Sequence, residues 1–577
     1  MSFAAAVRAG APANSNLEHV VDAPRVDARA ARRIVDALVD GGVDCVYGIP
    51  GGAISGVYDA MMASDIRVVV CQHEQMATYM AYGHARATGR PAAVAVTAGP
   101  GVLNTITSVA AAYKDEVPVV ILAGEVRRPM AGRGALQDGG EDGLDVINMF
   151  RSVTKFADTV QQAERAESLV RQAIQSAMTY PQGPAFLRIP LDATLEEVPS
   201  DPVRQASFAV LEPDARGCET IVRAIAEARQ PALFVGLGAR LAGLGPSLIQ
   251  FAERLRVPVI CDVEAKGLFP ESHSLSLGLF GIGGGGAATA YLQECDALVT
   301  LGARLDDTTT NAFSALLRPA FLAQLDHDAR RLGKAYDPDV AMATELDRAM
   351  TMLLSTAELP TVSHVLAREA AVRRAKAADT VVLGSVRTQS PFDPRSVVGF
   401  LQSAFPDDTI WTSDIGNHLL AVSRHLVLDR PDCFHASVGL GGMGSGIGVA
   451  MGLAEAHQKD RTVVGVCGDG SFRMVGAELA TCAKYNTPVV LVVFNDARYG
   501  MVAHGMDTVY GRVDYCEAPP VDVVAFAQAM GVRAVRVHTL ADLAGAAAMA
   551  GDGPLVIDLP IDPDVRILNP RNKTLAH

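Results

Sequence analysis

The chain has 577 residues, 49% of them apolar and 20% charged, which is typical of a soluble globular protein with roughly two to four domains, each large enough for its own core. Its net charge is −14 and it has no block of basic residues, which argues against nucleic acid or an anionic membrane surface as the main partner. Nine scattered cysteines without a Cys-x-x-Cys pair support neither a zinc site nor a disulfide framework, and no apolar stretch of about 18 residues exists to span a bilayer, so we expect a cytoplasmic protein.

The first third of the chain alternates between helical and strand patterns. Residues 1–25 are rich in Ala, Pro and Asn, lack the apolar core of a secretion signal, and are predicted to be a flexible leader. Residues 26–195 are predicted to form an α/β domain with a mostly parallel sheet, because apolar β-branched runs alternate with helical periodicity. The expected helix covers 30–39, and the expected strands cover 45–49, 66–71, 92–96 and 117–122.

Glu74 is the candidate for chemistry in this domain. It follows the expected strand 66–71 directly, at the start of a helix. Taken alone, this position has a simple structural explanation, because the helix dipole stabilises an acidic residue in the first turn. The glycine-containing segments around it, 47–53, 83–89 and 97–104, favour a functional interpretation instead.

The middle third repeats the same alternation. After a linker at 199–213, residues 205–355 are predicted to form a second α/β domain with strands at 232–236, 257–262, 297–301 and 320–325. The glycine run Gly281–Gly286 allows either a phosphate cradle or, more commonly, a surface connection. Residues 356–392 are polar, rich in Ala and Arg and partly helical in pattern, and are predicted to link this domain to the next.

A third α/β domain is predicted over residues 393–565, followed by a polar tail at 566–577. Within it, Gly439–Gly444 has the spacing Gly-x-Gly-x-x-Gly, and Asp460 stands about where a ribose-binding acid is expected. This pattern makes a nicotinamide-dependent dehydrogenase a rival hypothesis. We reject it because no clear strand pattern precedes the glycines and because Asp460 comes before its strand instead of ending it.

The clearest motif lies at two strand ends of this third domain. One buried-strand pattern ends in the segment Gly468–Ser471, and another ends in Asn495-Asp496. Because the carboxyl ends of parallel strands meet at one edge, Asp469 and Asp496 can converge there and bind Mg²⁺ or Ca²⁺ on a diphosphate, which glycine N–H groups can also approach. In isolation, a tight turn and an Asx turn explain either half.

Taken together, these segments resemble the thiamine-diphosphate (ThDP) enzyme family. Gly468-Asp469-Gly470 followed by Asn495-Asp496 is similar to the family's cofactor signature, although most members carry two asparagines at the second site. Four earlier segments occur in the family's order and look most like its acetolactate synthase branch: 47–53, 73–74, 83–89 and 97–104. The resemblance covers residues 27–562. It implies three doubly wound α/β domains with mostly parallel sheets: an aminopyrimidine-binding, a central and a diphosphate-binding domain.

The resemblance implies roles residue by residue. Glu74 would hydrogen-bond N1′ of the aminopyrimidine ring and so help to make C2 of the thiazolium a nucleophile. Met443 would force the cofactor into its bent shape, a backbone carbonyl near Gly441 would accept from the 4′-amino group, and Gln137 would contact the substrate. The implied Mg²⁺ ligands are Asp469, Asp496 and the backbone carbonyl of Arg498. The implied contacts to ThDP itself are Pro50, Gly51, Thr97, Asn104, Asn417, His418, Gly439, Gly470, Ser471 and Met501.

The implied activity is that of an acetolactate-synthase-like carboligase, which decarboxylates pyruvate or a related 2-oxo acid and adds the acyl unit to a second carbonyl compound. The alternatives are a 2-oxo acid decarboxylase, an acyltransferase and, more remotely, a non-catalytic cofactor-binding protein. The resemblance also implies at least a homodimer, often a tetramer, because each active site combines the first domain of one subunit with the third domain of its partner. Some members bind FAD on the central domain; the sequence leaves FAD open here, with Arg304 as the favoured contact.

Gly505 separates this chain from the synthases that favour a larger 2-oxo acid as acceptor. Those enzymes carry a tryptophan at this place, whereas Trp411 is the only tryptophan here. The loss of an indole leaves room in the acceptor pocket. We therefore expect an acceptor that is bulkier than, or unlike, 2-oxobutyrate.

Overall fold

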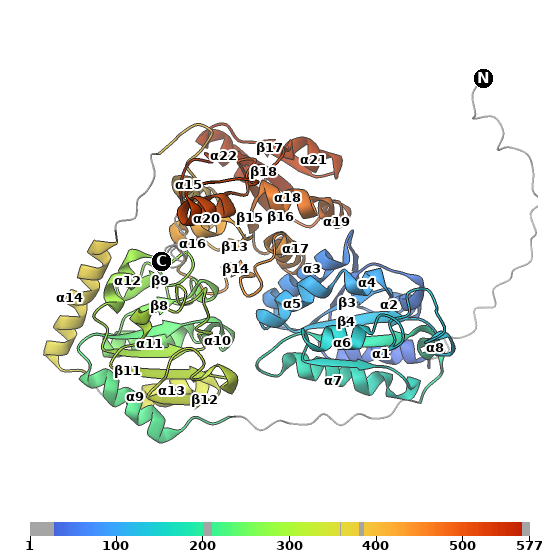
Figure 1. Ribbon diagram of the computed structural model, residues 1–577, viewed down its shortest axis with the longest axis horizontal. Helices are drawn as coiled ribbons and strands as arrows, with labels where there is room; N and C mark the ends of the chain where they lie inside the picture. Colours follow the sequence, from blue (N-terminus) through green and yellow to red (C-terminus); the bar gives the residue numbers. More distant parts are fainter. Residues whose placement is uncertain (1–27, 200–210, 358, 380–385, 568–577) are drawn as a thin grey trace, which may run out of the picture.

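Three domains, each built on one six-stranded parallel sheet, make up the computed structural model (Figure 1). The structure describes residues 28–199, 211–357, 359–379 and 386–567, so the predicted leader at 1–25 and most of the predicted tail lie outside the described residues. Helices flank every sheet, which confirms the predicted α/β class with doubly wound domains. Within the described ranges, no helix is both long enough and apolar enough to cross a membrane.

The first domain alternates strands with helices along the chain. Its strands are β1 (Cys45–Gly48), β2 (Arg67–Val70), β3 (Ala92–Val96), β4 (Val119–Glu125), β5 (Phe156–Thr159) and β6 (Ala185–Pro190). Its helices are α1 (Ala30–Asp40), α2 (Ser55–Met62), α3 (Glu74–Thr88), α4 (Pro100–Leu103), α5 (Ile106–Lys114), α6 (Val146–Arg151), α7 (Ala166–Met178) and α8 (Leu191–Leu195). The strand order is β2-β1-β3-β4-β6-β5, and the middle strands β3 and β4 are buried on both faces, as their continuous apolar runs predict. The order reverses between β1 and β3, which makes their carboxyl ends the switch point where such sheets bind ligands.

The central domain has the strand order β12-β11-β10-β7-β8-β9. Its strands are β7 (Pro231–Val235), β8 (Val259–Cys261), β9 (Ser276–Leu279), β10 (Ala297–Leu301), β11 (Phe321–Asp326) and β12 (Val340–Ala343). Its helices are α9 (Ala215–Glu227), α10 (Leu237–Leu241), α11 (Gly245–Leu255), α12 (Gly286–Leu292), α13 (Leu346–Thr356) and α14 (Val362–Ala378). The switch point lies between β7 and β10, where the N–H of Gly238 donates to the carbonyl of Gly302 at 2.8 Å and closes the two loops on each other.

Helix α14 is fastened to the central domain by Arg368. It packs against α12, and its Arg368 side chain is fully buried. The guanidinium donates to the carbonyls of Ile225 in α9 and Leu255 in α11. Helix C-termini carry partial negative charge, so these two carbonyls stabilise the buried guanidinium. Much of the segment predicted as a linker, 356–392, is thus a helix packed on the central domain.

The third domain repeats the relative strand order of the first, as β14-β13-β15-β16-β18-β17. Its strands are β13 (Ile410–Ser413), β14 (Phe434–Ala436), β15 (Val463–Gly468), β16 (Val489–Asn495), β17 (Arg533–Arg536) and β18 (Leu555–Pro560). Its helices are α15 (Pro394–Ala404), α16 (Asn417–His425), α17 (Ser445–His457), α18 (Asp469–Val475), α19 (Leu479–Tyr485), α20 (Gly500–Tyr510), α21 (Val523–Ala529) and α22 (Leu540–Ala547). The switch point lies between β13 and β15.

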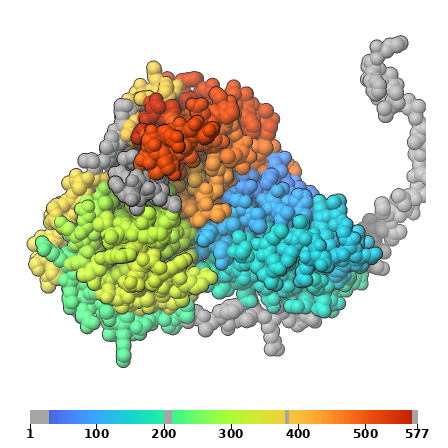
Figure 2. Space-filling view, viewed as in Figure 1, coloured from blue at the N-terminus to red at the C-terminus, as the bar shows by residue number. Residues whose placement is uncertain are grey.

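The first and third domains share one apolar core where α3 packs against α17 (Figure 1). Glycines let the two backbones approach: a Cβ on Gly83 would lie 2.2 Å from the carbonyl oxygen of Val449, and one on Gly452 would lie 1.9 Å from that of Met80. Figure 2 shows the third domain, in orange and red, resting on both the first domain, in blue, and the central domain, in green. The three domains therefore form one packed unit.

The glycine run Gly281–Gly286 lies between the central and third domains. A Cβ on Gly283 would overlap Ser423, and one on Gly285 would overlap Arg424, both of which belong to α16. The absence of side chains in this run allows close contact between domains. The run is therefore an interdomain contact and not an open surface connection.

Candidate active site

A cleft of about 120 Å³ lies in the third domain at the carboxyl ends of β13, β15 and β16, next to the switch point of the sheet. The helices α16, α18 and α20 begin at its walls. Each of these helices follows a strand within a few residues, and this local strand–turn–helix order places side chains from distant parts of the sequence at one edge. The cleft is lined by Ile415, Gly416, Asn417, His418, Met443, Gly468, Asp469, Gly470, Ser471, Phe494, Asp496, Arg498, Tyr499, Gly500, Met501, Val502 and Ile561.

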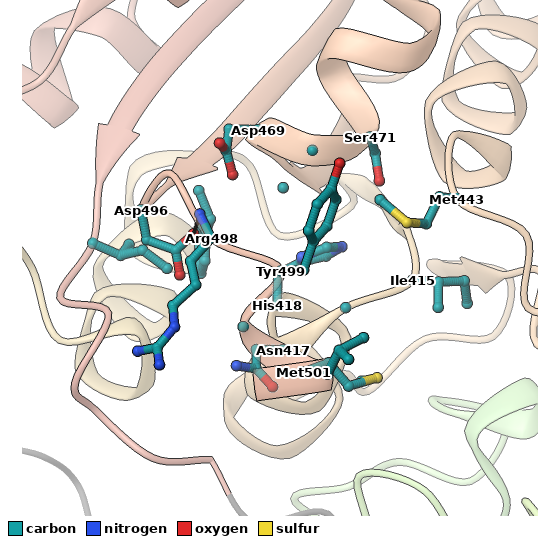
Figure 3. A pocket seen from close by; sticks show the side chains of 17 residues that line it. Ile415, Asn417, His418, Met443, Asp469, Ser471, Asp496, Arg498, Tyr499 and Met501 are labelled. Atoms are coloured by element: carbon teal, nitrogen blue, oxygen red, sulfur yellow. Dashed lines mark hydrogen bonds between the residues drawn. The ribbon is translucent and has the colours of Figure 1, made fainter. Parts of the chain in front are cut away.

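Asp469 and Asp496 lie at one end of this cleft (Figure 3). Burial and the charge of Asp469 raise the pKa of Asp496 to about 7, and burial raises the pKa of Asp469 although Arg473 lies 3.7 Å from its Oδ2. Two neighbouring carboxylates are the donors that a hard divalent cation prefers. In the described ranges, no three His, Cys, Asp or Glu side chains are arranged so that they could hold a metal ion together, so backbone and ligand oxygens would have to complete such a site.

Four buried polar atoms of this cleft have no hydrogen-bond partner among the residues that the structure describes: Oδ2 of Asp469, Oδ1 of Asn417, Nε2 of His418 and Oγ of Ser471. An unpaired buried polar atom costs about 1–3 kcal/mol, so four in one cleft indicate a polar ligand. Burial lowers the pKa of His418, which favours the neutral ring. The mixture of carboxylate, amide, hydroxyl and imidazole groups therefore fits a divalent cation together with a diphosphate.

His504 supports Asn417 from α20. The amide nitrogen of Asn417 lies 3.0 Å from Nδ1 of His504, and the other ring nitrogen lies 3.4 Å from the carbonyl oxygen of Pro563. With the amide nitrogen engaged, Oδ1 is the atom of Asn417 that lacks a partner. His504 thus orients Asn417 instead of facing the cleft itself.

Met443 borders the cleft opposite the two aspartates (Figure 3). A Cβ on Gly470 would lie 3.3 Å from Cε of Met443 and 3.0 Å from the ring of Tyr499, so a side chain at Gly470 would crowd both. The loop Gly439–Gly444 carries Met443, and its Gly441 has a φ of 73°, a conformation that favours glycine. The glycines of this loop therefore allow the backbone to turn sharply beside the cleft.

Glu74, Thr97 and Asn104 form a second cluster at the switch point of the first sheet. Glu74 begins α3 and is partly exposed, and the amide of Asn104 donates to its Oε2 at 3.0 Å. Thr97 follows β3 and packs against Gly51, where a Cβ would lie 2.5 Å from that of Thr97; Pro50 precedes Gly51. None of these residues lines the third-domain cleft. Within one chain, the predicted ThDP contacts of the first domain therefore lie outside the cleft that holds those of the third domain.

The remaining predicted residues lie outside the cleft. Gln137 belongs to the first domain, has a φ of 66°, and packs against Gly99. Gly439 contacts Asp115 where the domains meet, its N–H lying 2.9 Å from Oδ1, and Gly441 lies on the Met443 loop without lining the cleft. The structure therefore gathers the residues predicted for the metal and, apart from Gly439, the third-domain residues predicted to contact ThDP.

Sequence patterns alone do not identify several residues of the site. Tyr499, Phe494 and Ile415 line the cleft, but as apolar or aromatic residues near strand ends they look like core residues. Asp414 is fully buried and accepts the N–H of Gly444 at 2.9 Å, which fixes the start of α17. Its place directly after residues 409–413, a run with the pattern of a strand and the site of β13, is the signal that could have revealed it.

Arg304, the residue favoured for a flavin contact, lies in a network of acidic residues. Its Nη1 donates to the carbonyl of Lys114 at 2.6 Å, its Nη2 lies 2.5 Å from Glu264, and its Nε lies 3.4 Å from Asp306. The side chain is 7% exposed, although it borders a larger cleft of about 1070 Å³ between the first and central domains. These acidic groups and the carbonyl of Lys114 account for the burial of Arg304 without a flavin.

The dehydrogenase pattern is not realised around Gly439–Gly444. A strand of three residues, β14, does precede the glycines, contrary to the expectation from sequence, since so short a strand leaves no clear pattern. Asp460 lies before β15, as expected. A dinucleotide fingerprint needs an acidic residue after the next strand, and Asp460 is not in that place.

Comparison with known proteins agrees with this geometry. The chain matches all three parts of the thiamine pyrophosphate (ThDP) enzyme family: the N-terminal TPP binding domain over residues 28–145, the central domain over 218–353 and the C-terminal TPP binding domain over 414–559. The last of these ranges contains the whole third-domain cleft except Ile561. The first contains Glu74, Thr97 and Asn104.

Similar proteins span nearly the whole chain. The acetolactate synthase isozyme 2 large subunit of Escherichia coli is 31% identical over 92% of this chain and 95% of its own length. The acetolactate synthase large subunit of Parasynechococcus marenigrum is 32% identical over 94% and 88%, respectively. The structure of benzoylformate decarboxylase from Polynucleobacter necessarius superposes with a TM-score of 0.83 over 94% of this chain and 100% of that protein, at 23% identity, which shows a common fold. The chain therefore belongs to the thiamine-diphosphate-dependent enzyme family.

Proposed function

We propose that the protein is a ThDP- and Mg²⁺-dependent carboligase that decarboxylates pyruvate, or a related 2-oxo acid, and adds the acyl unit to a second carbonyl compound. The full-length relatives described as acetolactate synthase large subunits support this reaction class. The observation that carries the proposal is the third-domain cleft, where two neighbouring carboxylates and four unpartnered polar atoms meet the needs of a divalent cation and a diphosphate.

The residues of the cleft divide between these two groups. Asp469, Asp496 and the backbone carbonyl of Arg498 would bind Mg²⁺, whose preference for oxygen ligands they satisfy. When bound, ThDP supplies an electron sink for the carbanion that forms as a 2-oxo acid loses CO₂. Met443 would support the cofactor from the opposite side of the cleft. Contacts to the diphosphate would come from Asn417, His418, Gly470 and Ser471.

Glu74 would act on the aminopyrimidine ring bound in a second copy of the chain. Within one chain it lies outside the third-domain cleft, with one carboxylate oxygen held by Asn104 and the side chain partly exposed. A carboxylate oriented in this way can hydrogen-bond a ring nitrogen and exchange a proton with it. We therefore propose a homodimer, or a tetramer made of two such dimers, in which two chains complete each site.

The acceptor pocket would be open beside α20. Gly505 lies one helical turn after Met501, which lines the cleft, so the two residues share a face of the helix. A glycine there leaves the space that a large side chain would fill. Gly505→Trp should therefore shift the range of acceptors towards 2-oxobutyrate and away from bulkier carbonyl compounds, which a competition assay with acceptors of increasing size measures. An unchanged range would remove Gly505 from the pocket.

Product analysis with pyruvate, ThDP and Mg²⁺ tests the reaction itself. Acetolactate as the main product supports the carboligase. Acetaldehyde would identify a decarboxylase, and acetyl phosphate formed in phosphate buffer would identify an acyltransferase. If no 2-oxo acid released CO₂, the protein would be a non-catalytic cofactor binder.

Glu74→Gln tests the role of the glutamate within that reaction. Loss of a general acid–base group lowers kcat by about 10²- to 10⁴-fold, and we expect this decrease without a comparable change in ThDP affinity, because Glu74 is distant from the diphosphate residues. Steady-state kinetics and calorimetric titration of ThDP measure the two effects. Full activity in the variant would leave the fold assignment intact and refute the mechanism.

A further inference from the structure

Asp115 lies where the three domains meet, just after α5. Its side chain is 1% exposed. Oδ1 accepts the N–H of Gly439 at 2.9 Å, and Oδ2 accepts the hydroxyl of Ser437 at 2.6 Å. Both partners belong to the third domain and lead directly into the loop that carries Met443. A carboxylate of the first domain thus holds the beginning of this third-domain loop.

The far end of the loop is held by a second buried carboxylate, that of Asp414. The N–H of Gly444 donates to its Oδ2 and the N–H of Gly446 to its Oδ1, both at 2.9 Å. Four of the six residues in Gly439–Gly444 are glycines, and glycine loses more conformational entropy on ordering than any other residue. A segment of this composition keeps one conformation only if groups outside it hold it. Here the two holding groups come from different domains.

The contact at Asp115 leaves no space and is braced by the central domain. A Cβ on Gly439 would lie 2.3 Å from Oδ1 of Asp115 and 2.8 Å from Cβ of Lys114. Arg304 of the central domain approaches Oδ1 of Asp115 to 3.6 Å and donates to the carbonyl of Lys114 at 2.6 Å. The position of the loop therefore depends on the first domain directly and on the central domain through Arg304.

We propose that Asp115 is a positioning residue for the cofactor site of its own subunit. By holding Ser437 and Gly439, it would fix the loop so that Met443 keeps its place in the cleft. This inference rests on the proposed function, in which Met443 supports ThDP. The first domain then serves two active sites at once: Glu74 acts in the site of the partner, and Asp115 orders the site of its own chain.

Glu116, the neighbouring residue, offers a matched control. Its side chain is 2% exposed, like that of Asp115. Its carboxylate pairs with His327 at 2.9 Å and with Arg331, and both of these partners belong to the central domain. Glu116→Gln thus disturbs the same junction without removing the bonds to Ser437 and Gly439.

Amide hydrogen exchange of the full-length protein, without ThDP, tests the anchoring itself. We expect Asp115→Ala to speed exchange across residues 437–446 by at least about tenfold, because it removes the charge-assisted hydrogen bonds to Ser437 and Gly439, and Glu116→Gln to leave it unchanged. Asp115→Asn keeps an acceptor for Gly439 and should restore most of the protection. Equal exchange in wild type and Asp115→Ala, or equal acceleration in Asp115→Ala and Glu116→Gln, would overturn the proposal.

Calorimetric titration of ThDP with Mg²⁺ tests the consequence for the site. Asp115→Ala should raise the Kd by about tenfold, Asp115→Asn should raise it less, and Glu116→Gln should not change it. If ThDP bound Asp115→Ala as tightly as wild type, the positioning role would be wrong while the proposed function stood. If wild type itself did not bind ThDP, the proposed function would be wrong, and the exchange experiment alone would decide whether Asp115 anchors the loop.

Discussion

Asp496 in the third-domain cleft and Glu116 at the junction of the first and central domains are both buried carboxylates, yet their pKa values move in opposite directions. Burial and the charge of Asp469 raise the pKa of Asp496 to about 7. Burial acts to raise the pKa of Glu116 as well, but the hydrogen bond to His327 and the charge of Arg331 outweigh it and lower the value to about 2. The neighbouring charges decide the direction of each pKa shift, because Asp496 lies beside another acid whereas Glu116 lies beside two basic groups.

This difference separates residues that hold the architecture together from residues that bind a ligand. At the junction, the chain provides cationic partners for its own buried acids, so folding completes the interaction. In the cleft, acids lie beside each other and beside polar atoms without partners, an arrangement that costs stability in the protein alone. Such an arrangement is typical of functional sites, where a ligand provides the missing interactions.

The largest effect we expect is from Arg331→Met at the junction. The side chain of Arg331 is 16% exposed, pairs with Glu116 and lies 3.6 Å from Asp326, so the variant leaves buried carboxylates without their main cation. Breaking a buried ion pair in this way should lower the free energy of unfolding by about 3 kcal/mol. Urea denaturation followed by circular dichroism measures it.

Arg331→Lys is the control for this prediction. It keeps the positive charge but loses the planar guanidinium that contacts two acids at once, so we expect a smaller loss of stability. ThDP affinity should change little in either variant, because Arg331 does not line the third-domain cleft. A large loss of ThDP affinity at unchanged stability would contradict the division between architecture and ligand site.

Asp469→Ala in the cleft should have the opposite profile. Removal of a proposed metal ligand should weaken binding of Mg²⁺ and ThDP by at least about 100-fold. The free energy of unfolding of the protein without ligands should stay the same or rise, because the variant removes a carboxylate that raises the pKa of Asp496. Calorimetry and thermal unfolding measure the two quantities, and a variant that unfolds more easily but binds ThDP normally would refute this assignment.

Asp469, Asp496 and Asn417 of the cleft could be predicted from the sequence because each follows a strand within a few positions. Asp469 comes after an apolar run that ends in glycine, and Asn417 follows the strand 409–413 in the same way. In a parallel sheet, this local order is sufficient to bring side chains to a shared edge. The α/β class and the meeting of Asp469 and Asp496 in one cleft could therefore be predicted without the structure.

The contacts at the junction of the domains could not be predicted from the sequence, because they join parts of the chain that no local pattern connects. Asp115 contacts Ser437, more than 300 residues away, and Arg304 of the central domain approaches Asp115 and Gly439. Of the acids around Arg304, only Asp306 is close to it in sequence, whereas Glu264 and Asp115 come from distant parts of the chain, so the local pattern does not reveal this network. Tyr499 could not be predicted as a site residue either, because from the sequence an aromatic residue after a strand is indistinguishable from a core residue.

Asp496→Asn should weaken Mg²⁺ binding less than Asp469→Ala does. An amide oxygen can still bind Mg²⁺ but carries no charge, so we expect the affinity for Mg²⁺ in the presence of ThDP to fall by about tenfold. The protein without ligands should become more stable, because Asp469 then has a neutral neighbour. Titration of Mg²⁺ measures the affinity, and an increase in affinity would show that the charge of Asp496 does not contribute to metal binding.

The smallest effect concerns the pH dependence of stability at the junction. Burial acts to lower the pKa of His327, but Glu116 outweighs it and raises the value above the ordinary 6.5. His327, whose pKa is higher in the folded than in the unfolded protein, therefore stabilises the fold fully below pH 6.5. This contribution is lost as the pH rises through the raised pKa of the folded protein. Glu116, with its pKa lowered to about 2, contributes above its ordinary value of 4.5 and loses its contribution only as the pH falls towards 2.

As the pH rises above about 6.5, the midpoint temperature of unfolding should therefore fall in the wild type, and it should fall less in His327→Gln. Asp496, with its pKa at about 7, would contribute a slope in the same range, so both proteins should be compared in the Asp496→Asn background. If His327→Gln retained the full slope there, the histidine would be neutral in the folded protein. Glu116 would then depend on Arg331 alone for its charge partner, and the loss of stability expected for Arg331→Met would have to be larger than we predict.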